Sequence, residues 1–233
     1  MKLPRKAYSL VQKINEHTPH GTQISDVYML HEVYRAGETP REMVCAVELD
    51  RFAAWVERLS ARRVGTPEDV RCTGNILLTF DDVFSSALHN AVPILQEKRL
   101  PYTVFVAPAL LDQPEMISLD DLRALVRDPL CTIGAHTMRH AELRFLPPEE
   151  AKREMRDSKH FLEDIIGREV VNFAFPYGSV YACSRANIQQ VSSCGFRRAF
   201  STLNRAVTAQ DLTQPWFLPR HNVNDTVLKR EGF

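Results

Sequence analysis

The sequence predicts a single α/β domain, a parallel β/α barrel of about seven strands that is closed or nearly closed. Hydrophobic runs of strand length alternate with segments of helical periodicity along most of the 233 residues. This length is ordinary for one barrel, and no repeat or linker divides the chain. The polar residues that stand out follow directly after expected strand ends, which share one face of a parallel barrel. They are His31, Asp81, Asp82, His136, His140, Tyr177, Arg220 and His221.

Hydrophobic periodicity, together with Gly, Pro and capping residues at the ends, predicts each element. Pro93 must kink or shorten the start of one helix, because it lacks a backbone N–H. Gly167 and Gly195 are expected to end two helices. Residues 32–47 are expected to form a loop. The expected strands are 27–30, 76–80, 102–106, 130–134, 170–175, 196–200 and one beginning at 216, and the expected helices are 3–14, 49–63, 87–95, one from 118, 147–166 and 184–194.

An N-terminal unit, residues 1–22, is expected ahead of a barrel that takes residues 23–233. Within it, residues 3–14 carry apolar side chains at helical spacing and basic side chains mostly off that face, which predicts an amphipathic helix followed by a loop. A basic amphipathic helix suits transient contact with an anionic membrane surface. The alternative is that the helix covers the bottom of the barrel.

Composition excludes several classes of function. Lys plus Arg and Asp plus Glu both total 29, so the formal net charge is zero, and we expect no nucleic-acid partner because phosphate binding needs a basic footprint. The five scattered cysteines lack CxxC spacing, which is typical of reduced thiols in a reducing compartment. No signal peptide is recognisable, and no apolar stretch approaches the roughly 20 residues that span a bilayer. These features predict a cytoplasmic protein without a transmembrane segment.

Two adjacent carboxylates, Asp81 and Asp82, follow a strand that reads as buried on both faces. Ionised carboxylates cannot be buried side by side without partners, so we expect them where the strand ends and a cavity opens. Adjacent side chains on a strand diverge, so one carboxylate can hold a metal while the other moves a proton. The alternative is a helix cap, since Ser85 and Ser86 follow.

Residues 136–140, His-Thr-Met-Arg-His, bring two imidazoles to one side of a helix or tight turn. With Asp82 they make a facial set of two histidines and one carboxylate, which leaves coordination positions open for water and substrate. This set suits zinc best, and cobalt, nickel and iron are compatible with the same ligand types. Taken alone, the spacing also fits two solvated or capping histidines. The strand before it, and the carboxylate pair after another strand, favour the metal.

Three segments resemble, in order and spacing, the first three motifs of the polysaccharide deacetylases (carbohydrate esterase family 4, the NodB-homology domain). They are residues 79–82 (Thr-Phe-Asp-Asp), 136–140, and 175–178 (Phe-Pro-Tyr-Gly). The resemblance runs from residue 27 to residue 220. It implies a distorted (β/α)7 TIM-like barrel and metal-dependent removal of N- or O-acetyl groups from sugars.

By position, the resemblance implies that Asp82, His136 and His140 hold the metal and that Asp81 is the general base. Tyr177 would lend its backbone N–H to the oxyanion of the reaction.

The chain departs from the family pattern at two of these motifs. Val83 stands where many members have Gly, and Ala174 stands where many have an Arg that tethers the base. Residues 218–220, Leu-Pro-Arg, are shared with a branch of the family, so Arg220 is our candidate for the replacement tether.

His221 is our candidate general acid, because family members commonly place a catalytic His near the last strand. Here it stands one position later than in that pattern, and a shift of one residue on a strand moves a side chain to the other face. If the strand is regular, only one of Arg220 and His221 faces the site, whereas Pro219 could let both in. The alternatives are a surface role for His221 or His31 as the acid.

The function expected from these residues is removal of acetyl groups from a sugar by a metal-dependent hydrolase. A cytoplasmic deacetylase should meet a precursor of a surface polysaccharide, as a nucleotide sugar or a lipid-linked saccharide. Two alternatives stay open: a catalytically silent carbohydrate-binding barrel, and a hydrolase of another small amide such as a formyl sugar.

Overall fold

The computed structural model describes residues 9, 12–14, 16, 21–41 and 43–233. The expected helix at 3–14, and with it the boundary at residue 22, lies for the most part outside the described residues and stays a prediction.

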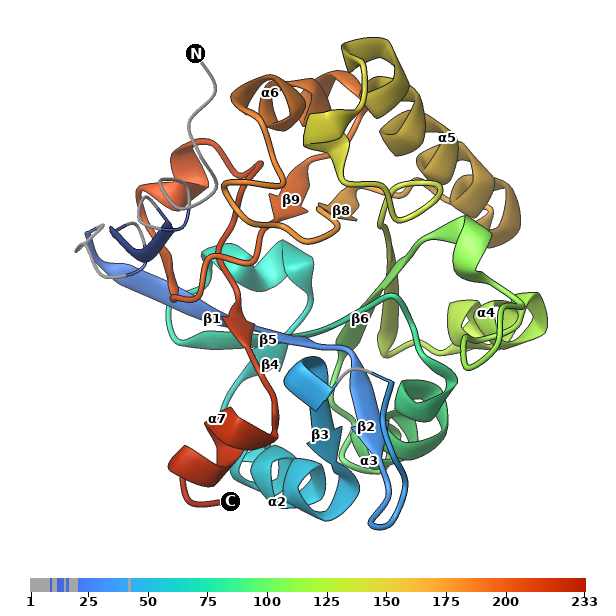
Figure 1. Cartoon of the computed structure of the whole chain (residues 1–233). Helices are drawn as coiled ribbons and strands as arrows, with labels where there is room; N and C mark the ends of the chain where they lie inside the picture. Colours follow the sequence, from blue (N-terminus) through green and yellow to red (C-terminus); the bar gives the residue numbers. More distant parts are fainter. Residues whose placement is uncertain (1–8, 10–11, 15, 17–20, 42) are drawn as a thin grey trace.

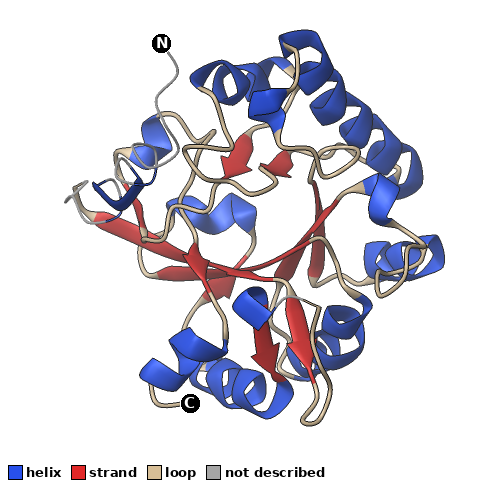
Figure 2. Cartoon of the chain, in the orientation of Figure 1, coloured by secondary structure: helices blue, strands red, loops and turns tan. Residues whose placement is uncertain are grey.

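One large sheet lies at the centre of the molecule (Figure 2). Its strands are β1 (Gln23–Leu30), β4 (Val64–Gly65), β5 (Asn75–Asp81), β6 (Tyr102–Val106), β7 (Cys131–Ala135), β8 (Asn172–Ala174), β9 (Arg198–Phe200), β10 (Val207–Thr208) and β11 (His221–Asn222). Their spatial order is β10-β1-β5-β6-β7-β8-β9, with β4 beside β5 and β11 beside β1. All neighbours from β1 to β9 are parallel, and only the described pair of β1 with β10 is antiparallel.

The chain after β10 closes this sheet into a barrel. Leu218 forms a parallel bridge with Phe200 at the end of β9, and β11 then pairs in parallel with β1, with His221 opposite Tyr28. Counting β1, β5, β6, β7, β8, β9 and the 218–222 segment gives seven parallel positions around the barrel. The predicted distorted (β/α)7 barrel in a single domain is therefore confirmed.

Helices surround the sheet (Figure 1). They are α2 (Leu49–Ser60), α3 (Val92–Glu97), α4 (Leu119–Arg127), α5 (Pro148–Ile166), α6 (Arg185–Ser193) and α7 (Asp225–Arg230). All of them except α7 lie in connections between parallel strands, because a parallel strand needs a crossover to return to the same end of the sheet. The helix expected at 87–95 begins as a π-helical turn, Ala87–Ala91, and Pro93 lies in the first turn of α3, where a missing N–H is tolerated.

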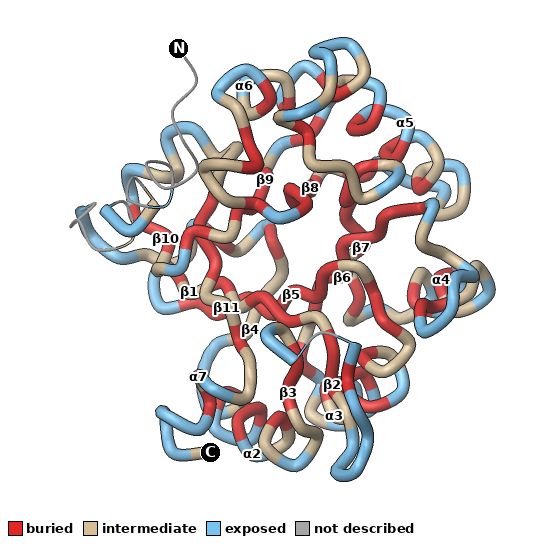
Figure 3. The backbone as a smooth tube through the Cα atoms, viewed as in Figure 1, coloured by how far each residue is buried: buried red, intermediate tan, exposed pale blue. Residues whose placement is uncertain are grey.

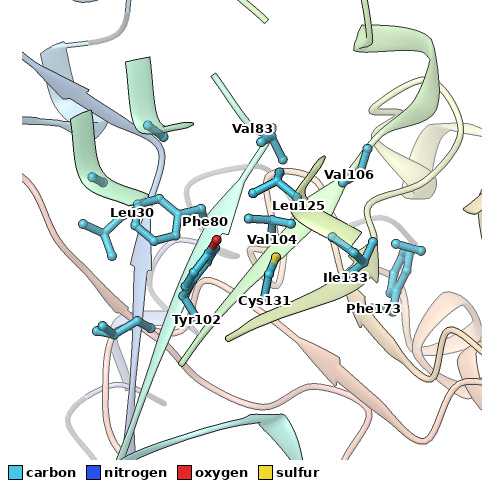
Figure 4. Packing of buried hydrophobic residues seen from close by; sticks show 14 of the residues in the cluster. Leu30, Phe80, Val83, Tyr102, Val104, Val106, Leu125, Cys131, Ile133 and Phe173 are labelled. Atoms are coloured by element: carbon cyan, nitrogen blue, oxygen red, sulfur yellow. The ribbon is translucent and has the colours of Figure 1, made fainter. Parts of the chain in front are cut away.

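The strands separate two hydrophobic cores. The larger core lies between the strands and the helices, where Phe80, Val104 and Ile133 pack with Leu125 of α4 (Figure 4). The smaller core fills the barrel interior, and the buried backbone at the centre of the molecule marks its position (Figure 3). Its residues are Val27, Val70, Leu77, Phe105, Ala174, Phe200, Val207 and Leu218. The interior is thus a packed apolar layer, above which polar groups lie at the carboxyl ends of the strands.

The prediction of a loop at residues 32–47 was wrong in part. The structure has two short parallel strands there, β2 (Glu32–Tyr34) and β3 (Ala46–Glu48), and a 3₁₀ turn at Met43–Cys45. Strands of three residues leave too short a pattern for periodicity to reveal. This small sheet lies over the bottom of the view in Figure 1, beside α2 and α3.

In the described part of the chain, no helix combines the length and the apolar character that crossing a membrane requires. None of the five cysteines, all of which are described, forms a disulfide, and Cys131, Cys183 and Cys194 are buried.

Candidate functional site

A cavity of about 440 Å³ opens at the carboxyl ends of the barrel strands. Six of the residues singled out in the sequence line it: His31, Asp81, Asp82, His136, His140 and Tyr177. They come from the ends of β1, β5, β7 and β8 and from the loops that follow. The parallel order of these strands brings segments far apart in the sequence to one face, as expected.

Three electron-pair donors converge in this cavity. Asp82 Oδ1 lies 3.3 Å from His136 Nε2 and 3.0 Å from His140 Nε2. His136 Nδ1 lies 2.8 Å from the carbonyl oxygen of Ala174 and must donate to it, so Nε2 is the nitrogen that faces Asp82 and is available to a metal. Asp82 Oδ1 is buried yet makes no hydrogen bond of good geometry to any described residue. One carboxylate oxygen and two imidazole nitrogens, all within 4.8 Å of one another, fit a divalent cation such as zinc.

The backbone around these donors is strained. A left-handed conformation is uncommon for a residue other than glycine, and such strain concentrates at functional sites. Five non-glycine residues in the loops that carry the cavity residues adopt it, with φ angles of 63° at Asp82, 56° at Val83, 59° at Thr137, 55° at His140 and 59° at Tyr177. Val83, which stands where the family often has Gly, is β-branched and buried.

Arg220 contacts Asp81 through a bidentate ion pair. Its two terminal nitrogens donate to Asp81 Oδ1 and Oδ2, both at 2.7 Å, and both side chains are almost completely buried. Arg220 Nε donates to the carbonyl of Ser201 at 2.9 Å, and Thr79 Oγ1 accepts a further bond at 3.1 Å. Arg220 thus contacts the carboxylate that the family Arg would tether. Ala174, which stands at the position of that Arg, contributes only its backbone carbonyl, which accepts the bond from His136.

The charges in the cavity set the protonation of its members. Burial alone would raise the pKa of Asp81, but the positive charge of Arg220 outweighs it, and the pKa lies below its ordinary value. Burial likewise opposes ionisation of Asp82, yet its contacts with His136 and His140 hold its pKa well below the usual range. The pKa of His136 is raised, because the charges of Asp81 and Asp82 outweigh its burial. Both carboxylates are therefore ionised at neutral pH.

His31 belongs to the same cavity but differs in character. Burial lowers the pKa of its imidazole, although Asp81 and Asp82 oppose the effect. Its Nδ1 is buried and makes no hydrogen bond to any described residue. A buried polar atom without a partner is rare in folded proteins, which marks His31 as a candidate functional residue of this cavity.

His221 does not face this cavity, which contradicts its expected place as general acid. It lines a separate cavity of about 260 Å³ beside α2 and α7, where its Nε2 lies 3.1 Å from Asp26 Oδ1. The physical reason is the alternation of side chains along a strand: Arg220 points into the barrel, and the next residue points out. Pro219 does not disturb this alternation, because β11 pairs regularly with β1 at His221 and Asn222.

The turn at 175–178 approaches the chain after β9 closely. Gly178 has a φ of 40°, and a Cβ there would come within 2.7 Å of the Thr202 backbone nitrogen. Thr202 N donates to the Gly178 carbonyl at 2.9 Å, and Thr202 Oγ1 donates to the Tyr177 carbonyl at 3.1 Å. The turn therefore holds Tyr177 at the cavity rim, where its ring lies 5.0 Å from that of His140.

Eight further residues line the cavity and were not expected there, among them the polar or reactive side chains of Arg41, Cys45 and Asn222. Arg41 and Cys45 belong to the segment after β1 that was expected to be a plain loop. Their position in a connection from a strand to a helix could have indicated a place at the site, because such connections build the active face of a barrel. Asn222 follows Arg220 at the spacing of two that returns a strand residue to the same face.

Comparison with known proteins identifies the family. A family model described as polysaccharide deacetylase matches residues 70–199, which is more than half of the chain. YxkH of Bacillus subtilis is 24% identical over 103 residues, which cover 44% of this chain and 37% of that protein. The poly-beta-1,6-N-acetyl-D-glucosamine N-deacetylase of Staphylococcus aureus is 21% identical over 164 residues, 65% of this chain and 55% of that protein. The chain thus spans about half the length or less of these curated relatives.

Solved structures show the same fold. The deacetylase PplD of Streptococcus pyogenes, in complex with acetate, superposes with a TM-score of 0.77 at 20% identity, covering 88% of this chain and 93% of that one. IcaB from Ammonifex degensii superposes with a TM-score of 0.73 at 21% identity, covering 91% and 96%. At these identities the likeness establishes the fold, and the family match carries the assignment. The chain belongs to the polysaccharide deacetylase family.

Proposed function

We propose that this protein is a metal-dependent hydrolase that removes acetyl groups from a sugar or glycan. The observation that carries the proposal is the convergence of Asp82 Oδ1, His136 Nε2 and His140 Nε2 beside a second carboxylate, Asp81. A zinc ion bound by these three atoms would polarise the acetyl carbonyl and lower the pKa of a bound water towards about 7. Family membership supports acetyl as the group removed.

Asp81 serves as the general base in this proposal. Arg220 takes one lone pair on each carboxylate oxygen, so each oxygen keeps another that can accept a proton from the attacking water. The low pKa keeps Asp81 ionised at neutral pH, as a base requires. The two bonds from Arg220 also fix the plane of the carboxylate, which reduces the entropy lost in reaching the transition state.

His31 serves as the proton donor to the leaving nitrogen, in place of His221. It lines the cavity that contains both carboxylates, and the charges of Asp81 and Asp82 favour the imidazolium form that would donate the proton. The backbone N–H of Tyr177, in a left-handed turn at the rim, would donate to the oxyanion.

Comparison of His31→Ala with His221→Ala tests the assignment of the proton donor. His31→Ala should lower kcat by about 10²–10⁴-fold, the range that general acid–base groups contribute, while zinc content stays near one per chain. His221→Ala should stay within about threefold of wild type, because its ring lies in the other cavity. The reverse pattern would return the role to His221.

The proposed substrate is a precursor of a surface polysaccharide in a reducing compartment, the cytoplasm. The five cysteines, none of them in a disulfide, support such a compartment. The name of the Staphylococcus aureus relative points to β-1,6-linked N-acetylglucosamine as the sugar to test beside nucleotide sugars and lipid-linked saccharides.

Release of acetate from these three substrate groups by the purified protein tests the proposal. Zinc-loaded protein should release acetate, and a chelator should abolish the release until zinc is restored. Asp82→Ala should lose both zinc and activity, whereas Asp81→Asn should keep the zinc and lose turnover. A fully active metal-free protein, or full zinc occupancy in Asp82→Ala, would overturn the metal site.

A further inference from the structure

The loop that carries His136 and His140 is held from outside by one buried carboxylate. Glu154 lies on α5 and is 4% exposed. Its Oε2 accepts a hydrogen bond from the backbone nitrogen of Arg139 at 2.9 Å, and its Oε1 accepts one from Arg139 Nε at 2.6 Å. A single side chain thus binds both the backbone and the side chain of the residue directly before His140.

The contact with Glu154 holds the loop in a strained backbone conformation. Thr137 and His140 both have left-handed φ angles, and the loop has no glycine to relieve them. Within the loop, Thr137 Oγ1 accepts from the Ala141 nitrogen at 2.9 Å, which is a purely local bond. Glu154 instead connects the loop to a helix of 19 residues that packs against the barrel. Residues in strained conformations persist only when surrounding structure holds them there.

The Glu154 carboxylate lies outside the cavity, and among the described residues its hydrogen-bond partner is Arg139. A buried carboxylate is costly unless it is paired and hydrogen-bonded, so this arrangement needs the loop in its present conformation. The dependence is mutual: the loop satisfies Glu154, and Glu154 fixes the loop.

We propose that Glu154 is a positioning residue of the metal centre, which holds His136 and His140 in the conformation that binds the ion. This inference rests on the proposed metal-dependent function. Residues that orient metal ligands typically contribute 10–100-fold to metal affinity. Removal of Glu154 should therefore weaken zinc binding and leave kcat at saturating zinc nearly unchanged, because the carboxylate lies outside the cavity.

The chain offers a matched control on the same helix. Glu150 lies one turn before Glu154 and accepts a bond from Arg139 Nη2 at 2.9 Å, but among the described residues it has no bond to the loop backbone. Its side chain is 33% exposed, against 4% for Glu154. Glu150→Gln therefore removes an ion pair with the same arginine and preserves the contact that positions the loop.

The experiment measures zinc affinity by competition with a chromogenic chelator, for wild type, Glu154→Gln and Glu150→Gln. Glu154→Gln should bind zinc about 10–100-fold more weakly, since its amide nitrogen cannot accept the second bond. Glu150→Gln should stay within about threefold of wild type. Near-wild-type affinity in Glu154→Gln, or equal losses in both variants, would overturn the positioning role.

Two further measurements keep the outcomes distinct. If Glu154→Gln fails to fold, Glu154→Asp replaces it, because Asp keeps the buried charge but is too short to reach both Arg139 nitrogens. The same loss of zinc affinity is expected for Glu154→Asp. Unchanged zinc affinity in that variant would overturn the inference. If wild-type protein itself binds no zinc, the proposed function fails instead. Thermal unfolding without zinc shows whether the variants differ only in stability, the result that a merely structural role would give.

Discussion

Arg220 and Asp81 form an ion pair in which each partner depends on the other. Both are buried, so loss of one leaves an uncompensated charge inside the barrel, which costs about 3–5 kcal/mol in comparable pairs. Lys can supply the charge but not the planar fork that binds both carboxylate oxygens. The identity of residue 220 therefore controls the geometry of Asp81 as well as its charge.

Arg220→Lys should lower kcat by about 10–100-fold, which corresponds to the loss of about 1.5–3 kcal/mol for a hydrogen bond between charged groups. The pKa of Asp81 should rise because one of its stabilising bonds is lost. Since the base must be ionised, activity falls as pH drops through this pKa, and the acidic limb of the pH–rate profile should move to higher pH. Kinetics between pH 4 and 9 measure both effects.

Arg205→Lys is the matched control, because Arg205 forms a bidentate pair with Asp211 that lies outside the cavity. It should leave the pH–rate profile unchanged. An unshifted profile in Arg220→Lys would contradict the tethering of the base by Arg220.

At the scale of elements, the sequence was most informative where a strand is long and buried on both faces. The run at 76–80 predicted β5 to within one residue at each end, and 102–106 matched β6. Convergence of the metal donors was also predictable, because parallel strand ends share a face. Periodicity could not reveal β2 and β3, since three residues carry no clear alternation.

The side-chain directions of Arg220 and His221 could not be predicted either. They depend on the register of β11 against β1, which is set by contacts with residues almost two hundred positions earlier. Val83 gives a related example: a β-branched residue in a left-handed conformation contradicts local preference, and only the surrounding fold imposes it.

The turn at 175–178 shows how an element depends on one small residue. In Gly178→Ala the new methyl group would meet the Thr202 backbone at 2.7 Å and the Phe175 carbonyl oxygen at 3.1 Å, so the turn must move and Tyr177 with it. We expect kcat to fall about tenfold or more if the oxyanion donor is displaced, with a loss of about 1–3 kcal/mol in stability. Gly74→Ala is the control.

Gly74 has a φ of 76° and open space around it, so its replacement adds only the cost of a left-handed Ala. Activity should be unchanged there, and stability should fall by about 1 kcal/mol. Acetate-release kinetics and urea unfolding of both variants measure the difference. Equal kinetics in the two variants would mean that the turn does not position a catalytic group.

At the scale of the whole molecule, Asp225 of α7 connects the segment that follows the last barrel strand to other elements of the fold. Its carboxylate accepts hydrogen bonds from the Glu48 backbone nitrogen at 3.0 Å and from Arg51 at 2.6 Å, and also from the hydroxyl of Tyr34. These partners lie in β2, β3 and α2, so one side chain connects the C-terminal helix to the small sheet and to the first helix of the barrel.

This network makes part of the stability depend on pH. Burial would raise the pKa of Asp225, but the bonds from Glu48, Tyr34 and Arg51 outweigh it and hold the pKa below its ordinary value. A carboxylate with a lowered folded-state pKa stabilises the native state above its unfolded-state pKa, and this contribution is lost as pH falls through the folded-state value. The free energy of unfolding should therefore decline below about pH 4.

Asp225→Asn should reduce the free energy of unfolding at pH 7, because the amide keeps the shape but loses the charge that binds Arg51. The difference from wild type should shrink as pH falls from about 4 towards 2, where the wild-type carboxyl becomes protonated as well. Urea unfolding at several pH values measures this, with Asp50→Asn, an exposed carboxylate on α2, as the control. If the difference in the free energy of unfolding between wild type and Asp225→Asn stays constant from pH 7 to pH 2, the charge of Asp225 does not hold α7 against the barrel.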